Sequence, residues 1–269
     1  MPLFHLVILA LIQGVTEFLP VSSSGHLVLY PLLADAPDQG LAIDVAVHVG
    51  TLFAVMLYFR RDVGAAIRGL IFMMQGDHQA QESRLALLLI LSTIPVVAVG
   101  AALSLGGLMD EFRSIAVIGW MTIIWGVALY AADMIGEHRK DTDDWSLPDA
   151  VWMGLMQVFS LIPGTSRSGV TMTMARALGY TRVDAARLSM LMSIPTIIAA
   201  GGFTTLELIL EGDAQLGLDA GLAAVLAFFA AVLSLSFMMR MLRTWSMTPF
   251  VIYRLILGVI LLSVAYSAS

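Results

Sequence analysis

The stretch "EFLPVSSSGH", residues 17–26, decides the fold of this chain. It places a carboxylate, a proline, three serines, a glycine and a histidine inside an apolar region that covers residues 3–33. A helix that crosses a membrane needs about 20 apolar residues, so this region is too long for one crossing and too short for two. Pro20 and Gly25 break it. We therefore expect two half-length helices that meet at a polar tip, which together form a re-entrant hairpin.

The composition agrees with a membrane protein. Of the 269 residues, 59% are hydrophobic and 13% are charged, whereas soluble domains are about half apolar and a quarter charged. The net charge of −6 argues against a nucleic-acid partner. There is no cysteine, so disulfides and thiol chemistry are excluded. The first residues lack the basic segment and cleavage site of a signal peptide, so we expect them to belong to the first hairpin.

A second apolar stretch is broken in the same way. "PGTSRSG", residues 163–169, interrupts the region 151–180, which we also interpret as a re-entrant hairpin. Full spans are predicted at residues 41–59, 85–106, 115–132, 188–206, 217–239 and 247–266. The expected fold is an all-α polytopic membrane protein with six transmembrane helices and two re-entrant helical hairpins.

The distribution of basic residues supports the second hairpin. If both hairpins return to the side from which they enter, most of the 14 Lys and Arg residues fall on one side and the loops of the other side keep only Arg113. The positive-inside rule then makes the basic side cytoplasmic and puts both termini outside. A full crossing by residues 151–180 would move Arg182, Arg187, Arg240 and Arg243 to the outer side.

The two halves of the chain share one plan, a broken hairpin followed by three spans. Because three is odd, the second copy is inverted relative to the first. We expect a single membrane domain, 1–269, made of an inverted repeat with halves 1–134 and 147–269. Inverted repeats with broken helices usually have their site near the midplane, where the broken helices meet.

The second tip has the chemistry of an anion site. Gly164 permits an unusual turn, and three hydroxyls can cap the helix that follows: Thr165, Ser166 and Ser168. The free N–H groups of such a helix start attract anions, and Arg167 adds a planar guanidinium that matches phosphate. The alternative is an ordinary capped helix whose arginine extends to the surface. A charge this deep in a membrane region favours a functional site.

The first tip repeats this chemistry. Ser22, Ser23 and Ser24 can begin a half-helix that carries His26 in its first turn. Gln13 and Glu17 are four residues apart and so share one helix face beside the serines. We expect Glu17, His26 and Arg167 to surround one anion, with a divalent metal as an option. The serines could instead be caps only, and His26 an interior histidine.

An anion pocket with hydroxyls and an acid–base pair suits phosphoryl transfer. A serine could attack phosphorus with His26 or Glu17 as its base, and water would then release the phosphate. Because the pocket opens into lipid, the expected substrate is an amphiphilic phosphate. His48, in the first full span, is a further candidate that lines the cavity or makes a helix contact.

Two longer motifs are recognisable. "QGVTEFLPVSSSGH" (13–26) and "PGTSRSGVTMTMA" (163–175) resemble the signature motifs of the undecaprenyl-diphosphate phosphatase family, also called bacitracin-resistance proteins. The resemblance covers essentially the whole chain. The family motif (E/Q)xxxE is met by Gln13 and Glu17. The motif PGxSRSxxT is met by Pro163, Gly164, Ser166, Arg167, Ser168 and Thr171.

The resemblance implies a bacterial inner-membrane hydrolase that converts undecaprenyl diphosphate to the monophosphate. This recycles the lipid carrier for cell-wall polymers, at a site on the outer (periplasmic) side, with a divalent cation such as Mg²⁺ or Ca²⁺. It marks Glu17, Ser23, His26 and Arg167 as the principal catalytic residues. The phosphate would contact Ser22, Ser24, Gly164, Thr165, Ser166, Ser168 and Thr171.

Several alternatives stay open. Gln13 replaces a glutamate that many members carry, which weakens a metal site made by two glutamates and leaves Glu17 as the possible ligand and Gln13 as a weak one. The nucleophile could be Ser23, which we favour, or His26 or water. Inverted repeats and broken helices are also typical of transporters, so a transporter or flippase of a polyprenyl phosphate lipid is the alternative function. The expected partners are the polyprenyl diphosphate substrate and membrane lipids, and a homodimer is left open.

Overall fold

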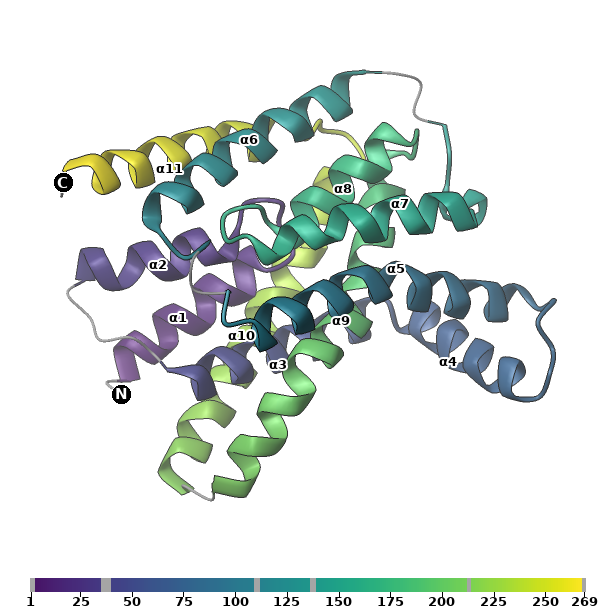
Figure 1. The fold of residues 1–269 in the computed structure, drawn as a ribbon, viewed down its shortest axis with the longest axis horizontal. Coiled ribbons are helices and arrows are strands. Elements are labelled where there is room, and N and C mark those ends of the chain that lie inside the picture. Colours follow the sequence, from purple (N-terminus) through teal and green to yellow (C-terminus); the bar gives the residue numbers. More distant parts are fainter. Residues whose placement is uncertain (1–2, 35–39, 109–111, 136–138, 212–213, 268–269) are drawn as a thin grey trace.

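The computed structural model describes residues 3–34, 40–108, 112–135, 139–211 and 214–267. Within these ranges it is built from helices, with one isolated bridge between Lys140 and Tyr180. The helices are α1 (Leu3–Thr16), α2 (Ser23–Ala34), α3 (Leu41–Tyr58), α4 (Arg60–Met74), α5 (Gln81–Leu105), α6 (Ile115–Met134), α7 (Leu147–Gln157), α8 (Arg167–Ala177), α9 (Arg182–Glu211), α10 (Ala214–Met241) and α11 (Thr248–Ser267), shown in Figure 1. Two short 3₁₀ helices are η2 (Thr142–Asp144) and η3 (Val158–Leu161).

Five of these helices are long and apolar enough to cross a membrane: α5, α6, α9, α10 and α11. Helices α3 and α4 form a pair bent by 91°, which could provide a sixth crossing. The expectation of an all-helical, multi-pass membrane protein is therefore confirmed. Helix α4 was not expected, because residues 60–74 were placed between two spans. Arg60, Arg61 and Arg68 interrupt its apolar positions, so no continuous apolar run signals it.

The two broken stretches each form a pair of short helices. Helices α1 and α2 are separated by the turn that contains Pro20, and α7 and α8 by η3 and the loop that contains Gly164. These helices have 11–14 residues, which at 1.5 Å per residue gives lengths of roughly 16–21 Å. A hydrocarbon core is about 30 Å thick, so none of the four could cross it alone.

Each short helix pair packs on a long helix from the other half of the chain. Helix α1 lies along α10, and α7 lies along α5, while α6 pairs with α11 and α3 with both α9 and α10. Gly14 makes the first contact close, since a Cβ there would come within 2.6 Å of Ala230 Cβ. Gly154 does the same for α7 against Ser92 of α5. Small residues at such contacts are typical of packed membrane helices.

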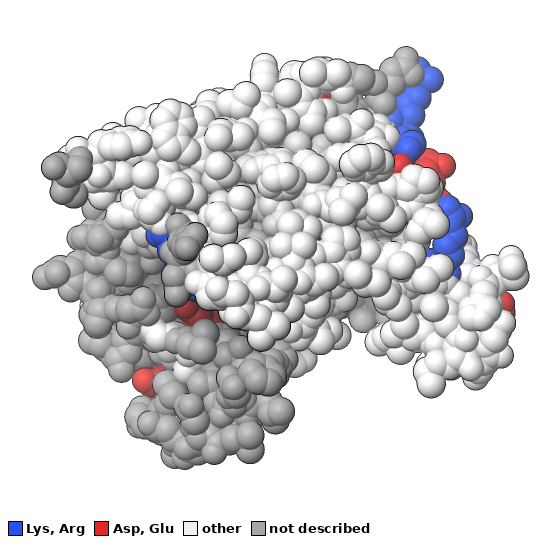
Figure 2. All heavy atoms as spheres, in the orientation of Figure 1, with Lys and Arg blue, Asp and Glu red and all other residues white. Residues whose placement is uncertain are grey.

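Basic residues gather at one end of the molecule. On the face seen in Figure 2, most blue atoms lie where α6 ends and α7 begins. The ion pairs at this end include Arg187–Asp62, Lys140–Asp149, Arg176–Asp133, Arg182–Asp133 and Arg68–Glu82. Helix α1 begins and α11 ends at the opposite end (Figure 1). Below, the end with these pairs is called the basic end.

Candidate active site

The turns of the two broken helix pairs have similar local sequences and a similar backbone conformation. Residues 22–25 read SSSG and residues 166–169 read SRSG. Ser22 (φ 73°) and Ser166 (φ 68°) are the described non-glycine residues with a left-handed backbone, a conformation that costs about 1–3 kcal/mol and concentrates at functional sites. In each tip the serine hydroxyls at the first and third positions lie 3.0–3.1 Å apart. Ser23 and Arg167 therefore occupy corresponding positions, each at the first residue of a helix.

The two tips hold each other through reciprocal hydrogen bonds. The backbone N–H of Gly164 donates to Ser24 Oγ at 3.0 Å. In return, Ser168 Oγ donates to the carbonyl oxygen of Leu19 at 2.9 Å. The third residue of each four-residue stretch, Ser24 or Ser168, thus binds the backbone of the other tip. These bonds hold the N-terminal ends of α2 and α8 next to each other.

A residue that the sequence analysis missed joins both tips. Arg254 of α11 is fully buried, and its guanidinium donates to the carbonyl oxygens of Pro20, Gly164 and Thr165 at 2.9–3.2 Å. It also donates to the carbonyls of Met121 and Thr122 in α6. All of these partners are neutral carbonyls. A lone arginine in an apolar span is a signal of a functional position, and it could have been recognised from the sequence.

Glu17 and Arg167 form a buried ion pair across the two tips. Arg167 Nη2 lies 2.8 Å from Glu17 Oε1, and the side chains are 12% and 7% exposed. The other terminal nitrogen, Arg167 Nη1, is buried and has no hydrogen-bond partner among the described atoms. A buried charged N–H group without a partner is costly, so this nitrogen is available for an anionic ligand.

Gln13 links Glu17 to His48. Its Nε2 donates to Glu17 Oε2 at 2.7 Å and approaches His48 Nε2 at 3.0 Å. Since His48 Nδ1 lies 2.7 Å from the carbonyl oxygen of Asp44, which can only accept, neutral His48 carries its proton on Nδ1. Gln13 Oε1 is buried and has no partner among the described residues. Ser23 Oγ also donates to Glu17 Oε2, at 3.4 Å.

A cavity of about 410 Å³ lies beside this network. The tips contribute the polar side chains Glu17, Ser22, Ser23, Ser24, Ser166 and Arg167. Helices α3 and α9 and the segment before the second tip contribute Asp44, Val45, His48, Ser160, Ile162, Thr196, Ile197, Ala200 and Gly201. One part of the lining is therefore charged and rich in hydroxyls, and another is apolar. Such a lining suits a phosphate that carries an apolar chain.

His26 is not among the residues that line this cavity. Its ring stacks on Tyr253, with centroids 5.5 Å apart and planes inclined by 9°, and its Nε2 lies 2.5 Å from the Tyr253 hydroxyl. Its Nδ1 lies 2.8 Å from the carbonyl oxygen of Ser22, which holds the ring against α11. The expected grouping of Glu17, His26 and Arg167 is thus not formed, and His48 is the histidine beside Glu17, at 3.8 Å.

Four of the expected phosphate contacts also lie outside the cavity lining. The N–H of Gly164 and the hydroxyl of Ser168 serve the contacts between the tips. Thr171 bonds to Ser189 of α9 at 2.6 Å, because its position one turn into α8 faces that helix. Thr165 is fully buried, and its hydroxyl lacks a partner in the part of the chain that the structure describes. The structure therefore brings Ser22, Ser24 and Ser166 to the cavity and gives the other four supporting positions.

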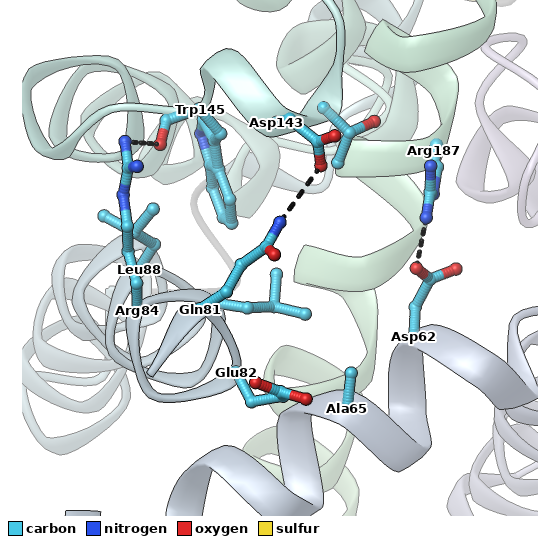
Figure 3. Close-up of a pocket in the computed structure, with 11 residues that line it drawn as sticks. Asp62, Ala65, Gln81, Glu82, Arg84, Leu88, Asp143, Trp145 and Arg187 are labelled. Carbon is cyan, nitrogen blue, oxygen red and sulfur yellow. Dashed lines mark hydrogen bonds and ion pairs between the residues drawn. The ribbon is translucent and has the colours of Figure 1, made fainter. Parts of the chain in front are cut away.

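A second cavity, of about 320 Å³, lies at the basic end (Figure 3). Figure 3 shows Arg187 bonded to Asp62, Gln81 to Asp143, and Arg84 to the carbonyl of Trp145. Neither serine nor histidine lines it. Its arginines also have protein partners already. This second cavity is therefore a weaker candidate for phosphoryl transfer than the cavity at the tips.

Comparison with known proteins identifies the family of this chain. The family model described as bacitracin resistance protein BacA matches residues 6–260. The undecaprenyl-diphosphatases of Jannaschia sp. (strain CCS1) and Ruegeria pomeroyi are 58% and 57% identical over 267 residues, which cover 99% of this chain and 100% of each relative. That of Alcanivorax borkumensis is 47% identical over 262 residues, or 96% of this chain and 97% of the relative. The chain therefore belongs to the BacA family of bacitracin resistance proteins.

Proposed function

We infer that the chain is a multi-pass membrane phosphatase that hydrolyses undecaprenyl diphosphate to undecaprenyl phosphate and inorganic phosphate. The names of its relatives give the reaction. The observation that carries the assignment in this structure is Arg167. Arg167 lines the cavity; one arm of its guanidinium is held by Glu17, and the other is buried with no partner among the described residues. A planar guanidinium with one free arm is suited to a phosphate oxygen.

The substrate would enter with its terminal phosphate toward the two tips. The starts of α2 and α8 present backbone N–H groups and the positive ends of their dipoles to that phosphate. Ile162, Ile197 and Ala200 supply apolar surface for the first part of the prenyl chain. This division of the lining supports an amphiphilic diphosphate over a small soluble phosphate ester.

Ser23 is the proposed nucleophile. Its Oγ attacks the terminal phosphorus, the bond from that phosphorus to the bridging oxygen breaks, and undecaprenyl phosphate leaves. The serine proton passes to Glu17 Oε2, to which Ser23 already donates. Water then attacks the phosphoserine, and Glu17 returns its proton to Oγ as the P–Oγ bond breaks. The surplus proton of the water goes to a phosphate oxygen. Arg167 offsets the charge on the transferred phosphoryl group.

The two histidines have different proposed roles. His48 and Gln13 orient Glu17 from one side, because Gln13 donates to both. His26 is proposed as a positioning residue rather than a base, since it binds the carbonyl of Ser22 and stacks on Tyr253. Its ring would help to hold Ser22 in the left-handed conformation that starts α2.

The family implies a divalent cation, and the residues present fit one. The described part of the chain holds no group of three His, Cys, Asp or Glu that could bind a metal alone. Mg²⁺ often takes one or two carboxylates and completes its shell with water and substrate phosphate. Glu17 and the unpartnered Oε1 of Gln13 would be its protein ligands. When bound, the cation would neutralise charge on the diphosphate.

We further propose the topology of six crossings and two re-entrant hairpins, with repeats 1–134 and 147–269. The short lengths of α1, α2, α7 and α8 support the hairpins, and the matching tips support the repeat. The basic end would face the cytoplasm of a bacterial inner membrane. The termini would then lie on the outer side, and the cavity would open toward it.

Phosphate release by the purified protein tests the function. Detergent-solubilised protein with undecaprenyl diphosphate and Mg²⁺ is expected to release phosphate, and Arg167→Ala is expected to lose this activity. Arg68→Ala, at an exposed arginine of the basic end, serves as the matched control. Absence of release from the folded wild-type protein would exclude the phosphatase and favour the transporter alternative.

A further inference from the structure

A shallow basin of about 420 Å³ lies at the basic end, outside both cavities described above. It is formed where the turn between α8 and α9 meets the end of α10. Its lining consists of Arg176, Thr181, Arg182, Val183, Leu242 and Arg243. None of these residues lines the cavity at the tips. The basin therefore belongs to a different part of the molecule from the proposed active site.

Positive charge exceeds negative charge in the basin. Arg176 is 2% exposed and uses all three nitrogens, on Asp133 and on the carbonyl of Tyr180. Arg182 reaches the same Asp133 with its Nε alone, and Asp133 also accepts from the N–H of Met247. The Asp133 carboxylate thus accepts hydrogen bonds from two guanidinium groups. The terminal nitrogens of Arg182 are not used in these bonds.

Arg243 adds a further positive charge. Its side chain is exposed and makes no ion pair or side-chain hydrogen bond within the described residues. The start of α9 lies in the same place, and its dipole adds a partial positive charge. Asp184 is the acidic residue on that turn, and its two oxygens accept from Thr142 and Thr181. Its carboxylate is thereby held by hydroxyls rather than by the arginines of the basin.

The surroundings of the basin are apolar. Val183 and Leu242 line it together with the arginines. Trp245, in the turn between α10 and α11, is 58% exposed. Exposed tryptophans at the ends of membrane helices typically lie at the level of the lipid headgroups. A ligand here would therefore meet arginines with its charged part and apolar side chains beside them.

We propose that this basin binds the phosphate of an anionic phospholipid headgroup in the leaflet at the basic end. Unpaired guanidinium nitrogens are the groups that recognise a phosphodiester. Inorganic phosphate has the same chemistry, but the apolar border and Trp245 favour a lipid. The headgroup would connect α8, α9 and α10 at their ends, so its binding should stabilise the folded protein. This site does not depend on the proposed phosphatase activity.

The test compares lipids on the purified full-length protein in a neutral detergent. Phosphatidylglycerol is expected to raise the apparent melting temperature of the wild type by about 2–4 °C more than phosphatidylcholine does. Arg243→Gln is expected to lose this difference, and native mass spectrometry should show less retained phosphatidylglycerol. Arg243 is the preferred site because Arg182 also holds Asp133, so that Arg182→Gln would lower stability by itself.

Arg68→Gln is the matched control, since Arg68 is an exposed arginine that does not line the basin. It should keep the full difference between the two lipids. An Arg243→Gln protein that keeps the difference, or an Arg68→Gln protein that loses it equally, would overturn the proposal. If sodium phosphate alone gives the same increase as phosphatidylglycerol, the site takes free phosphate and the assignment to a lipid is wrong.

Discussion

Replacing Arg254 with methionine should uncouple the two tips while leaving every residue that lines the cavity unchanged. Two tip carbonyls would lose the donor that Arg254 provides, those of Pro20 and Thr165, while the Gly164 carbonyl would keep only its bond from Thr122 Oγ1. Each buried acceptor without a partner costs about 1–3 kcal/mol. Removal of a buried guanidinium that lacks a carboxylate partner offsets part of this cost. If the catalytic arrangement of the tips is destabilised by a net free energy of roughly 3 kcal/mol, kcat would fall about 10²-fold.

Arg254→Lys separates the charge of this residue from its shape. An ammonium keeps the positive charge, but it cannot direct donors to several carbonyls in the plane of a guanidinium. The lysine variant should therefore have an activity between those of the wild type and the methionine variant. If the charge alone mattered, the lysine variant would equal the wild type.

The assay is steady-state phosphate release with thermal unfolding of the same samples. We expect kcat to fall more than KM rises, because Arg254 does not line the cavity. Arg68→Met provides the control for loss of an arginine at an exposed position. A methionine variant that melts at a lower temperature but keeps kcat within about twofold would show that Arg254 supports stability only, and the positioning argument would fail.

Four substitutions at the cavity test the individual roles. Arg167→Ala should lower kcat by about 10³-fold or more, since it removes the charge at the phosphoryl group, and activity near the wild-type value would contradict this. Glu17→Gln should be nearly inactive but folded; a change in Mg²⁺ dependence alone would contradict its role as a base and leave only its role as a ligand. Ser23→Ala should abolish both turnover and an acid-stable phosphoenzyme trapped by rapid quenching, and appreciable turnover would exclude covalent attack by Ser23. His48→Asn should reduce kcat about tenfold, because Glu17 keeps its bonds to Arg167 and Gln13; unchanged kinetics would assign His48 a structural role only.

The long helices could be predicted where the apolar composition of a segment is enough to indicate a membrane span. Five expected spans correspond to single long helices, because apolar runs of this length have few alternatives. The breaks at Pro20 and Pro163 were predictable from the residues themselves. Helix α4 could not be predicted in this way, since its three arginines interrupt the apolar run. Its packing against α5 is seen only in the structure. The bend of 91° before it also has no signal in the sequence.

Several residues of the site could be predicted from the sequence, but most of the contacts between them could not. Glu17, Ser23 and Arg167 do meet at the cavity, as the position of each near a tip suggested. The direction of His26 depends on Tyr253, which is 227 residues away in sequence. The role of Gln13 depends on His48, which reaches it from another helix. Such pairings are set by tertiary packing, and a motif read along the chain cannot give them.

The equivalence of Ser23 and Arg167 explains why two tips are needed. A single tip offers one helix start and one side chain at its first position, which suffices to bind an anion but not to transfer a phosphoryl group. Two tips face to face place a hydroxyl and a guanidinium at matching positions beside one cavity. Glu17 from the first tip holds Arg167 of the second, and Arg254 holds the backbones of both. Opening of either hairpin would therefore separate Ser23, the proposed nucleophile, from Arg167. The proposed reaction thus requires both halves to be folded together.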